Sequence, residues 1–165
     1  MVIKPMRGQF AYQIMPLLMV CCQQKDKQIK KEEKDMEKAL AFLKQCRTFY
    51  LATTEEDQPR VRPFGAVCAF EGKLYIVTNN KKKVYAQILK NPKTEISGMY
   101  EGKWIRLAGE LVTDDRREAR EAMLAENPML KSMYSADDGI MEVLYLKNAE
   151  ASICSFTAPP ETWSF

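Results

Sequence analysis

Short strand-like segments separated by tight turns are the feature that most constrains this fold. Between residues 48 and 113, stretches rich in β-branched and aromatic residues alternate with turn sequences at residues 55–59 (EEDQP), Glu71-Gly72 and Glu101-Gly102. Turns this short join neighbouring antiparallel strands. A doubly wound parallel sheet is disfavoured, because strand–helix alternation and a Gly-x-Gly-x-x-Gly turn after a strand are both missing.

The segments with strand character number six to seven, and helices are expected at the joints between them. We expect strands at residues 48–54, 60–70, 73–78, 94–100, 103–112, 141–147 and 150–156. We expect helices at residues 33–47, 82–90 and 114–127, with a short helical piece at 128–134. Pro63 and Gly65 indicate an edge, a bulge or an irregular stretch within the second strand. This pattern predicts a small barrel with short peripheral helices, of the mainly-β or α+β class.

The chain is expected to divide into an N-terminal extension, residues 1–35, and a compact domain, residues 36–165. The extension holds an apolar stretch at residues 10–22 (FAYQIMPLLMVCC) and a mixed-charge segment at residues 23–35. The charged segment suits either a linker or the exposed start of a helix.

The apolar stretch has two interpretations. It is too short to span a bilayer, and Pro16 interrupts it. One interpretation is an apolar arm, or an upstream extension that precedes a true start at Met36. The other is a signal-peptide core, since Lys4 and Arg7 precede it, with Cys21 or Cys22 attached to lipid.

The composition removes several classes of function. The chain has no histidine, which excludes Ser-His and Cys-His nucleophile pairs and His-containing zinc sites. A net charge of +3 is too balanced for a generic nucleic-acid binder. We therefore expect no metal site and no nucleic-acid partner, and any chemistry is expected to come from a cofactor.

The five cysteines include no Cys-x-x-Cys pair and do not form a secreted disulfide framework. Cys46, Cys68 and Cys154 lie among apolar neighbours and are expected to be small core residues. A reducing, cytoplasmic location is the main expectation, and a membrane-anchored lipoprotein is the alternative.

A strand that ends in Thr78-Asn79 and a helix that starts among Lys81, Lys82 and Lys83 give the strongest chemical signal. Free N–H groups at a helix start, with lysines beside them, can bind an anion. The competing interpretation is a capped surface helix with solvated lysines. Three lysines oppose the helix dipole, however, which favours a phosphate ligand.

Arg60 and Arg62 give a second signal, because alternation along a strand places both on one face. They are either solvated arginines or a second arm of the same anion site, with the Pro63–Gly65 backbone exposed to a flat ligand. On the later hairpin, Trp104 is expected in the core or an interface, and Arg106 can reach the same ligand.

Four segments in order carry a resemblance to a known family: PRVRPFG, LYIVTNNKKKVYAQILKNP, GKWIRLAGELV and MYSADDG…EVLYLK. Together they resemble the pyridoxamine 5′-phosphate oxidase-like FMN-binding split-barrel proteins, and more narrowly the short bacterial members related to nitroimidazole-resistance reductases. The resemblance covers roughly residues 36–165. It implies a six-stranded antiparallel split β-barrel and a homodimer, with FMN held non-covalently in clefts at the dimer interface.

The resemblance also implies site residues. Arg62 matches the residue that reaches the FMN phosphate, and Lys83 is preferred for the second phosphate contact, with Lys82 or Lys81 as alternatives. The other matching positions line the flavin or the partner chain: Arg60, Val61, Pro63, Phe64, Thr78, Asn79, Trp104 and Arg106.

The resemblance implies an FMN-dependent oxidoreductase that acts on an unidentified small molecule by hydride or electron transfer, with NAD(P)H as a candidate reductant. No catalytic side chain is assigned. The chain ends in TAPPETWSF, without the Arg- and His-containing segment of full-length oxidases, which argues against genuine pyridoxamine phosphate oxidation. The alternatives are a non-catalytic flavin-binding module, such as a redox sensor or carrier, and a structural dimer.

Overall fold

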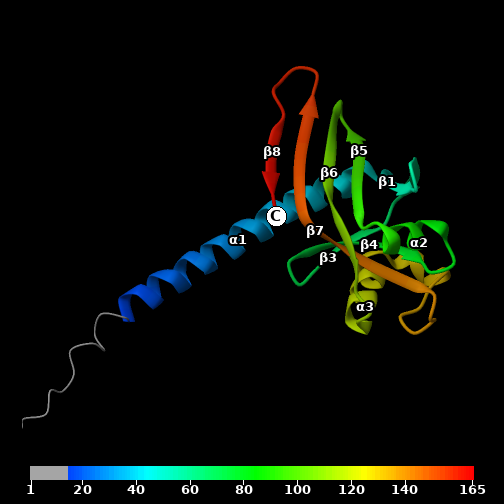
Figure 1. Cartoon of the computed structure of the whole chain (residues 1–165), viewed down its shortest axis with the longest axis horizontal. Helices are drawn as coiled ribbons and strands as arrows, with labels where there is room; N and C mark the ends of the chain where they lie inside the picture. The colour runs from blue at the N-terminus through cyan, green and yellow to red at the C-terminus, as the bar shows by residue number, and fades with distance from the viewer. Residues whose placement is uncertain (1–14) are drawn as a thin grey trace, which may run out of the picture. The chain divides into compact units, whose positions relative to one another are not determined.

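The structure, a computed structural model, describes residues 15–165 and the side chains from residue 24 on. It divides into two compact units, Met1–Lys31 and Glu32–Phe165. Helix α1 (Met15–Cys46) makes the charged segment 23–35 helical rather than a linker, and the helix predicted at 33–47 begins earlier, at Met15 (Figure 1). Residues 10–14 of the predicted apolar arm lie outside the described residues, and the boundary at residue 35 stays a prediction.

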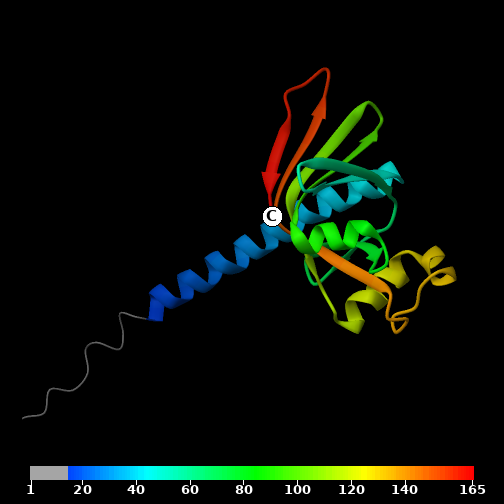
Figure 2. The ribbon, with the colours of Figure 1, turned by 45° about the vertical axis from the view of Figure 1, so that its right-hand side comes forward.

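The unit Glu32–Phe165 is built on antiparallel strands with helices at their joints (Figures 1 and 2). Its strands are β1 (Phe49–Glu55), β2 (Gln58–Phe64), β3 (Val67–Phe70), β4 (Lys73–Asn79), β5 (Lys93–Tyr100), β6 (Lys103–Thr113), β7 (Met141–Ser155) and β8 (Glu161–Ser164). Its other helices are α2 (Lys83–Lys90), α3 (Arg117–Glu126) and the 3-10 helix η1 (Pro128–Ser132).

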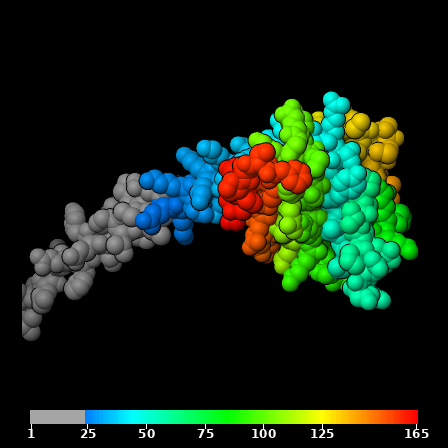
Figure 3. All heavy atoms as spheres, turned by 90° about the horizontal axis from the view of Figure 1, so that it is seen from above, coloured from blue at the N-terminus to red at the C-terminus, as the bar shows by residue number. Residues whose placement is uncertain are grey.

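All strands belong to one sheet with the order β2-β1-β5-β6-β7-β4-β3, and β8 pairs with β7 outside this path. Strands β2 and β3 lie at the two ends of the path, yet only Gly65-Ala66 separates them along the chain. The sheet therefore returns on itself, as a split barrel does. Figure 3 shows β7–β8, β5–β6 and β1–β2 side by side in that order.

The predicted hairpin turns at Glu71-Gly72 and Glu101-Gly102 are confirmed. Both residues of each turn have positive φ, 46° and 71° in the first and 47° and 72° in the second. Two-residue loops with two positive φ values match the twist of the strands that they join.

Three strand predictions need correction, and the sheet has eight strands rather than six. The predicted strand 60–70 is two strands, because the chain leaves β2 at Gly65 and enters β3 at Val67. The predicted strands 141–147 and 150–156 are one continuous strand, β7. The tail forms β8, which was not predicted because its prolines obscured a four-residue strand.

A β-bulge explains why β7 resembled two strands. Glu110 pairs with Lys147 and Ala108 with Glu150, so two residues of β7 oppose Gly109 alone. Asn148 within this bulge has φ 53°, a turn-like value, although the strand continues through it. A Cβ on Gly109 would lie 2.9 Å from the Lys147 carbonyl oxygen. Glycine is therefore required there for close approach of the two backbones.

The core has two clusters, one on each face of the sheet. The larger cluster joins the inner face of α1, including Leu40 and Leu43, to the barrel interior. The smaller one packs Met123 and Leu124 of α3 against β3, β4 and β7. Cys68 is fully buried as predicted, whereas Cys46 and Cys154 are half-buried.

A buried carboxylate, Asp114, links β4 to the start of α3. Asp114 is 6% exposed and accepts hydrogen bonds from the Tyr75 hydroxyl at 2.7 Å and from Arg116 Nη2 at 2.8 Å. The Arg116 guanidinium, with help from Tyr75, holds the pKa of Asp114 well below its ordinary value. Glu71 also binds Arg116, at 2.8 Å. In the described residues, no helix is long and apolar enough to cross a membrane.

Replacing Gly109 with alanine is expected to lower the free energy of unfolding by about 1–3 kcal/mol, because backbone atoms of β7 cannot move away from the new Cβ. Urea denaturation measures this. Gly139→Ala is the control, since Gly139 has φ 68° and nothing within 4 Å. It should lose about 1–2 kcal/mol, from left-handed strain alone. An effect in the control with none at Gly109 would contradict the steric account.

Replacing Asp114 with asparagine is expected to lower the free energy of unfolding by about 1–3 kcal/mol at pH 7, because the buried network loses its negative charge and one of its two acceptor oxygens. The folded pKa lies below the unfolded value of about 3.9. The carboxylate therefore stabilises the fold fully above that pH, and this contribution is lost as the pH falls. Urea unfolding between pH 7 and pH 2 should show a shallower acid loss in the variant, and equal slopes would contradict the assignment.

Candidate functional site

Four cations gather in a pocket of about 370 Å³ between β2 and the start of α2, here called the small pocket. It is lined by Glu55, Arg60, Arg62, Lys82, Lys83, Val84 and Gln87. The carboxylate in this set, Glu55, binds Arg60 at 2.7 Å, and this hydrogen bond lowers the pKa of Glu55. The remaining three cations form no ion pair among the described residues, and Glu55 acts on Arg62 and Lys83 only through space. The small pocket therefore carries a positive surplus suited to an anion.

Arg62 is the most firmly held of these cations. Its Nη1 donates to Thr53 Oγ1 at 2.7 Å, and its Nη2 donates to Gln87 Oε1 at 2.7 Å. Thr53 in turn donates to Gln87 at 2.7 Å, and both are buried. Partial burial, with the neighbouring Arg60 second, lowers the pKa of Arg62. Neutral oxygens thus fix the guanidinium in place without neutralising it.

The start of α2 supplies the lysines of the small pocket. Helix α2 begins at Lys83, and Lys82 at the N-cap makes no side-chain capping bond. The first N–H groups of α2 therefore have no side-chain acceptor. Lys82 and Lys83 both line the small pocket, whereas Lys81 lines neither the small pocket nor the larger pocket that adjoins it.

A second pocket of about 730 Å³, here called the large pocket, shares Arg62, Lys82 and Val84 with the small one. Its wall is mostly apolar, and it is lined by Lys44, Arg47, Arg62, Pro63, Phe64, Gly65, Ala66, Val67, Val77, Lys82, Val84, Glu126, Asn127, Met129, Leu130, Met133 and Tyr134. A cationic pocket that opens into an apolar one can receive a flat molecule with an anionic end.

Several predicted site residues flank the pockets without lining them. Val61 is 63% exposed and lines neither pocket. Thr78 is 2% exposed, and its hydroxyl has no hydrogen-bond partner. Asn79 donates to the Tyr134 hydroxyl at 3.1 Å and so contacts a wall residue of the large pocket.

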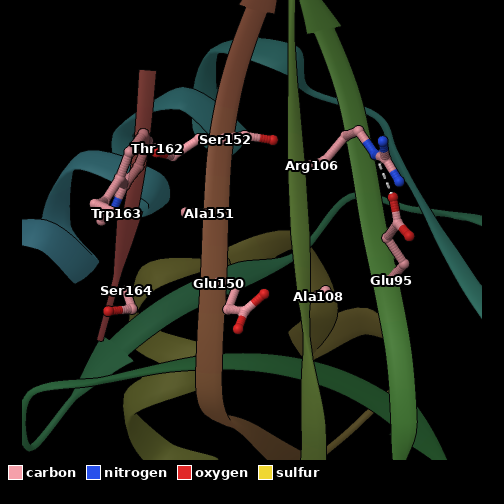
Figure 4. A pocket seen from close by; sticks show the side chains of 9 residues that line it. All are labelled: Glu95, Arg106, Ala108, Glu150, Ala151, Ser152, Thr162, Trp163 and Ser164. Atoms are coloured by element: carbon pink, nitrogen blue, oxygen red, sulfur yellow. Dashed lines mark hydrogen bonds and ion pairs between the residues drawn. The ribbon is translucent and has the colours of Figure 1, made fainter. Parts of the chain in front are cut away.

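Trp104 and Arg106 are not brought together with the other predicted residues. They lie on β6, where Trp104 packs against Phe156 at 5.1 Å and Arg106 binds Glu95 at 2.5 Å. Arg106 lines a groove of about 500 Å³ across β5, β6, β7 and β8, here called the outer groove (Figure 4). The groove residues are Glu95, Arg106, Ala108, Glu150, Ala151, Ser152, Thr162, Trp163 and Ser164.

Sequence reasoning missed Thr53, Gln87 and the wall that α1, α3 and η1 give the large pocket. Gln87 did carry a signal, since it is a polar residue on the buried face of α2 beside Val84 and Ile88. The side chains of the two pockets include no thiol and no close pair of carboxylates. They can bind, orient and exclude water, but redox chemistry here needs a bound group. No cluster of three or more potential metal ligands occurs in the described part of the chain.

Similarity to known proteins identifies the family of this chain. The family model described as pyridoxamine 5′-phosphate oxidase matches residues 36–151, and the chain belongs to this family. No curated protein matches the sequence.

Solved structures agree with this assignment. A NimC/NimA family protein from Clostridium acetobutylicum shares 56% identity and a TM-score of 0.81, covering 83% of this chain and 96% of that one. General stress protein 26 from Bacillus anthracis shares 17% identity and a TM-score of 0.60, over 72% and 89%. A pyridoxamine 5′-phosphate oxidase-related, FMN-binding protein from Nostoc punctiforme shares 17% identity and a TM-score of 0.51, over 73% and 88%. The last two show the fold alone.

Proposed function

We propose that this protein is an FMN-dependent oxidoreductase that acts on a small molecule. The observation that carries the proposal is the Arg62 guanidinium, which Thr53 and Gln87 hold at 2.7 Å without an acidic partner. A half-buried, unneutralised cation is unfavourable by itself, and a bound anion relieves that cost. FMN-binding relatives within the fold support flavin as the ligand.

The donor set of the small pocket fits a phosphate. A phosphate monoester carries nearly two negative charges and several acceptor oxygens. Arg62 offers a planar pair of donors, and Lys82 and Lys83 offer ammonium groups beside it. The uncapped N–H groups of α2 add donors of the kind that phosphates favour.

The large pocket fits a ring system next to that phosphate. Pro63, Phe64 and Gly65 present strand backbone and one aromatic side chain along the wall. Phe64 is fixed by stacking on Phe49 at 6.2 Å. A rigid wall of this kind orients a flat group at low entropic cost.

Bound FMN would supply hydride or electron transfer. The chain's own contribution is binding and orientation. Thr53 and Gln87 position Arg62, the lysines neutralise charge, and the apolar wall excludes water from the large pocket. NAD(P)H is our candidate reductant. It would be a second anionic ligand, and the small pocket presents no unpaired carboxylate that would repel it.

We further propose a homodimer in which the outer groove meets the partner. Trp104 and Arg106 are remote from Arg62 within one chain, so they can reach a flavin only in a partner's site. The groove presents Ala108, Ala151 and Trp163, which suit a protein interface. A cytoplasmic location accords with the free thiols of the described cysteines.

Arg62→Ala is expected to weaken FMN binding by about 1–3 kcal/mol, roughly 5-fold to 150-fold, because a charge-assisted phosphate contact is lost. Lys82→Ala and Lys83→Ala should weaken it by smaller factors. The matched control is Lys81→Ala, which removes an adjacent lysine that lines neither pocket. Flavin fluorescence titration measures all four variants.

The same titration can refute the proposal. A wild-type protein that is colourless as purified and takes up no added FMN would exclude flavin. Flavin that binds but is not reduced by NAD(P)H or reoxidised by any acceptor would favour the flavin-binding module instead.

The dimer is tested by sedimentation velocity and by mixing subunits. Arg62→Ala and Arg106→Ala homodimers should each bind FMN weakly. In mixed dimers, one site combines intact Arg62 and intact Arg106, so about half of the tight binding sites should return. Tight binding by the Arg106→Ala homodimer, or a monomeric wild type, would contradict the shared site.

A further inference from the structure

Arg47 stands out among the arginines of the described residues because its guanidinium has no hydrogen bond or ion pair. Each of the others binds at least one oxygen: Arg60, Arg62, Arg106, Arg116, Arg117 and Arg120. Arg47 lines the large pocket and is exposed. Its charge is therefore available to a ligand.

The backbone of Arg47 gives a second observation. Directly after the last residue of α1, Arg47 has φ 58°, a conformation that helices usually end with glycine. Its carbonyl oxygen lies 3.1 Å from where a Cβ on Gly65 would stand, so the residue is fixed against the β2–β3 link. The position of the Arg47 side chain at the pocket wall is therefore set by its backbone.

Two cations, Lys44 and Arg47, line the large pocket but not the small one, and one of them has no ion pair. Glu126 binds Lys44 at 2.6 Å and neutralises it. Arg47 is thus the uncompensated cation there, whereas Arg62 and Lys82 lie at the boundary with the small pocket. A single guanidinium matches a carboxylate, with two parallel hydrogen bonds, better than it matches a doubly charged phosphate.

The wall beside Arg47 suits an aromatic ring. Phe64, Leu130 and Tyr134 line it together with Met129 and Met133, which are 78% and 62% exposed. Methionine side chains adapt to flat molecules and make favourable sulfur–aromatic contacts.

We propose that Arg47 is a specificity-determining residue that binds the carboxylate of a small aromatic substrate in the large pocket. This inference rests on the proposed function, since it names the substrate class of the same site. The carboxylate lies at Arg47 and the ring lies against Met129 and Met133, which leaves the wall at Pro63–Gly65 to the flavin. The opposite, more cationic end is left for the cofactor phosphate.

The test is calorimetric binding of benzoate, benzamide and phenyl phosphate to the full chain, with and without FMN. Benzoate should bind at least tenfold tighter than benzamide, which has the same shape and no charge. Arg47→Gln and Arg47→Gly should each weaken benzoate at least tenfold and leave benzamide within twofold. The matched control is Lys131→Gln, which removes an exposed cation of η1 that does not line the pocket.

The Arg47→Gly variant keeps the proposal falsifiable. Glycine adopts the left-handed backbone without strain, so the melting temperature of this variant should be no lower than that of the parent protein. Benzoate affinity that is unchanged in both Arg47 variants overturns the proposal, and so does tighter binding of phenyl phosphate than of benzoate by the FMN-loaded protein, in which the cofactor phosphate already occupies the small pocket. Failure to take up FMN overturns the proposed function instead. In that case the flavin-free titration with benzoate still decides the role of Arg47.

Discussion

The two-residue link Gly65-Ala66 is the constraint on which the rest of the fold depends. It joins β2 and β3, which are the first and last strands of the sheet path, so the sheet must curve until its two ends meet. This junction lies in the wall of the large pocket. The residue after α1 packs against it, since the Arg47 carbonyl oxygen lies 3.1 Å from where a Cβ at residue 65 would stand. The junction that closes the barrel therefore also forms part of the wall of the large pocket.

The unneutralised cations of the small pocket do not favour the stability of the fold. A fold selected only for stability would place an acid beside Arg62, as it does beside Arg60 and Arg116. Here the guanidinium is fixed by the side-chain oxygens of Thr53 and Gln87 instead. Neutral acceptors orient the cation but do not neutralise its charge. The contrast with the Asp114–Arg116 pair before α3 separates a structural arginine from a binding one.

The sequence allowed the local features to be predicted, because each depended on neighbours in the chain. The glycine turns, the amphipathic inner face of α1 and the lysines at the start of α2 are such features. The bulge at Gly109 was not predictable, since it depends on which residues of β7 oppose it. The predicted break between residues 147 and 150 coincides with Asn148, and the strand pairing shows that it is a bulge rather than a turn.

The site shows the same division between local and tertiary information. Alternation along β2 placed Arg60 and Arg62 together, and both line the small pocket. Gln87, which holds Arg62, is 25 residues away and comes from another element. Trp104 and Arg106 lie on a different surface of the chain, so their assignment to a flavin site depends on an assembly that single-chain patterns do not encode.

The two ends of the large pocket differ in charge, and this difference can orient a ligand. Toward the small pocket, the cations without acidic partners are Arg62, Lys82 and Lys83. At the other end Glu126 cancels Lys44 and leaves Arg47. A dianion gains more electrostatic binding energy near Arg62 and the lysines than near Arg47, whereas a monoanion can bind at either place. Once a dianion occupies the first place, a monoanion is therefore directed to Arg47. Cofactor and substrate can thus be sorted by charge alone, without a titrating side chain, which suits a chain that contains no histidine.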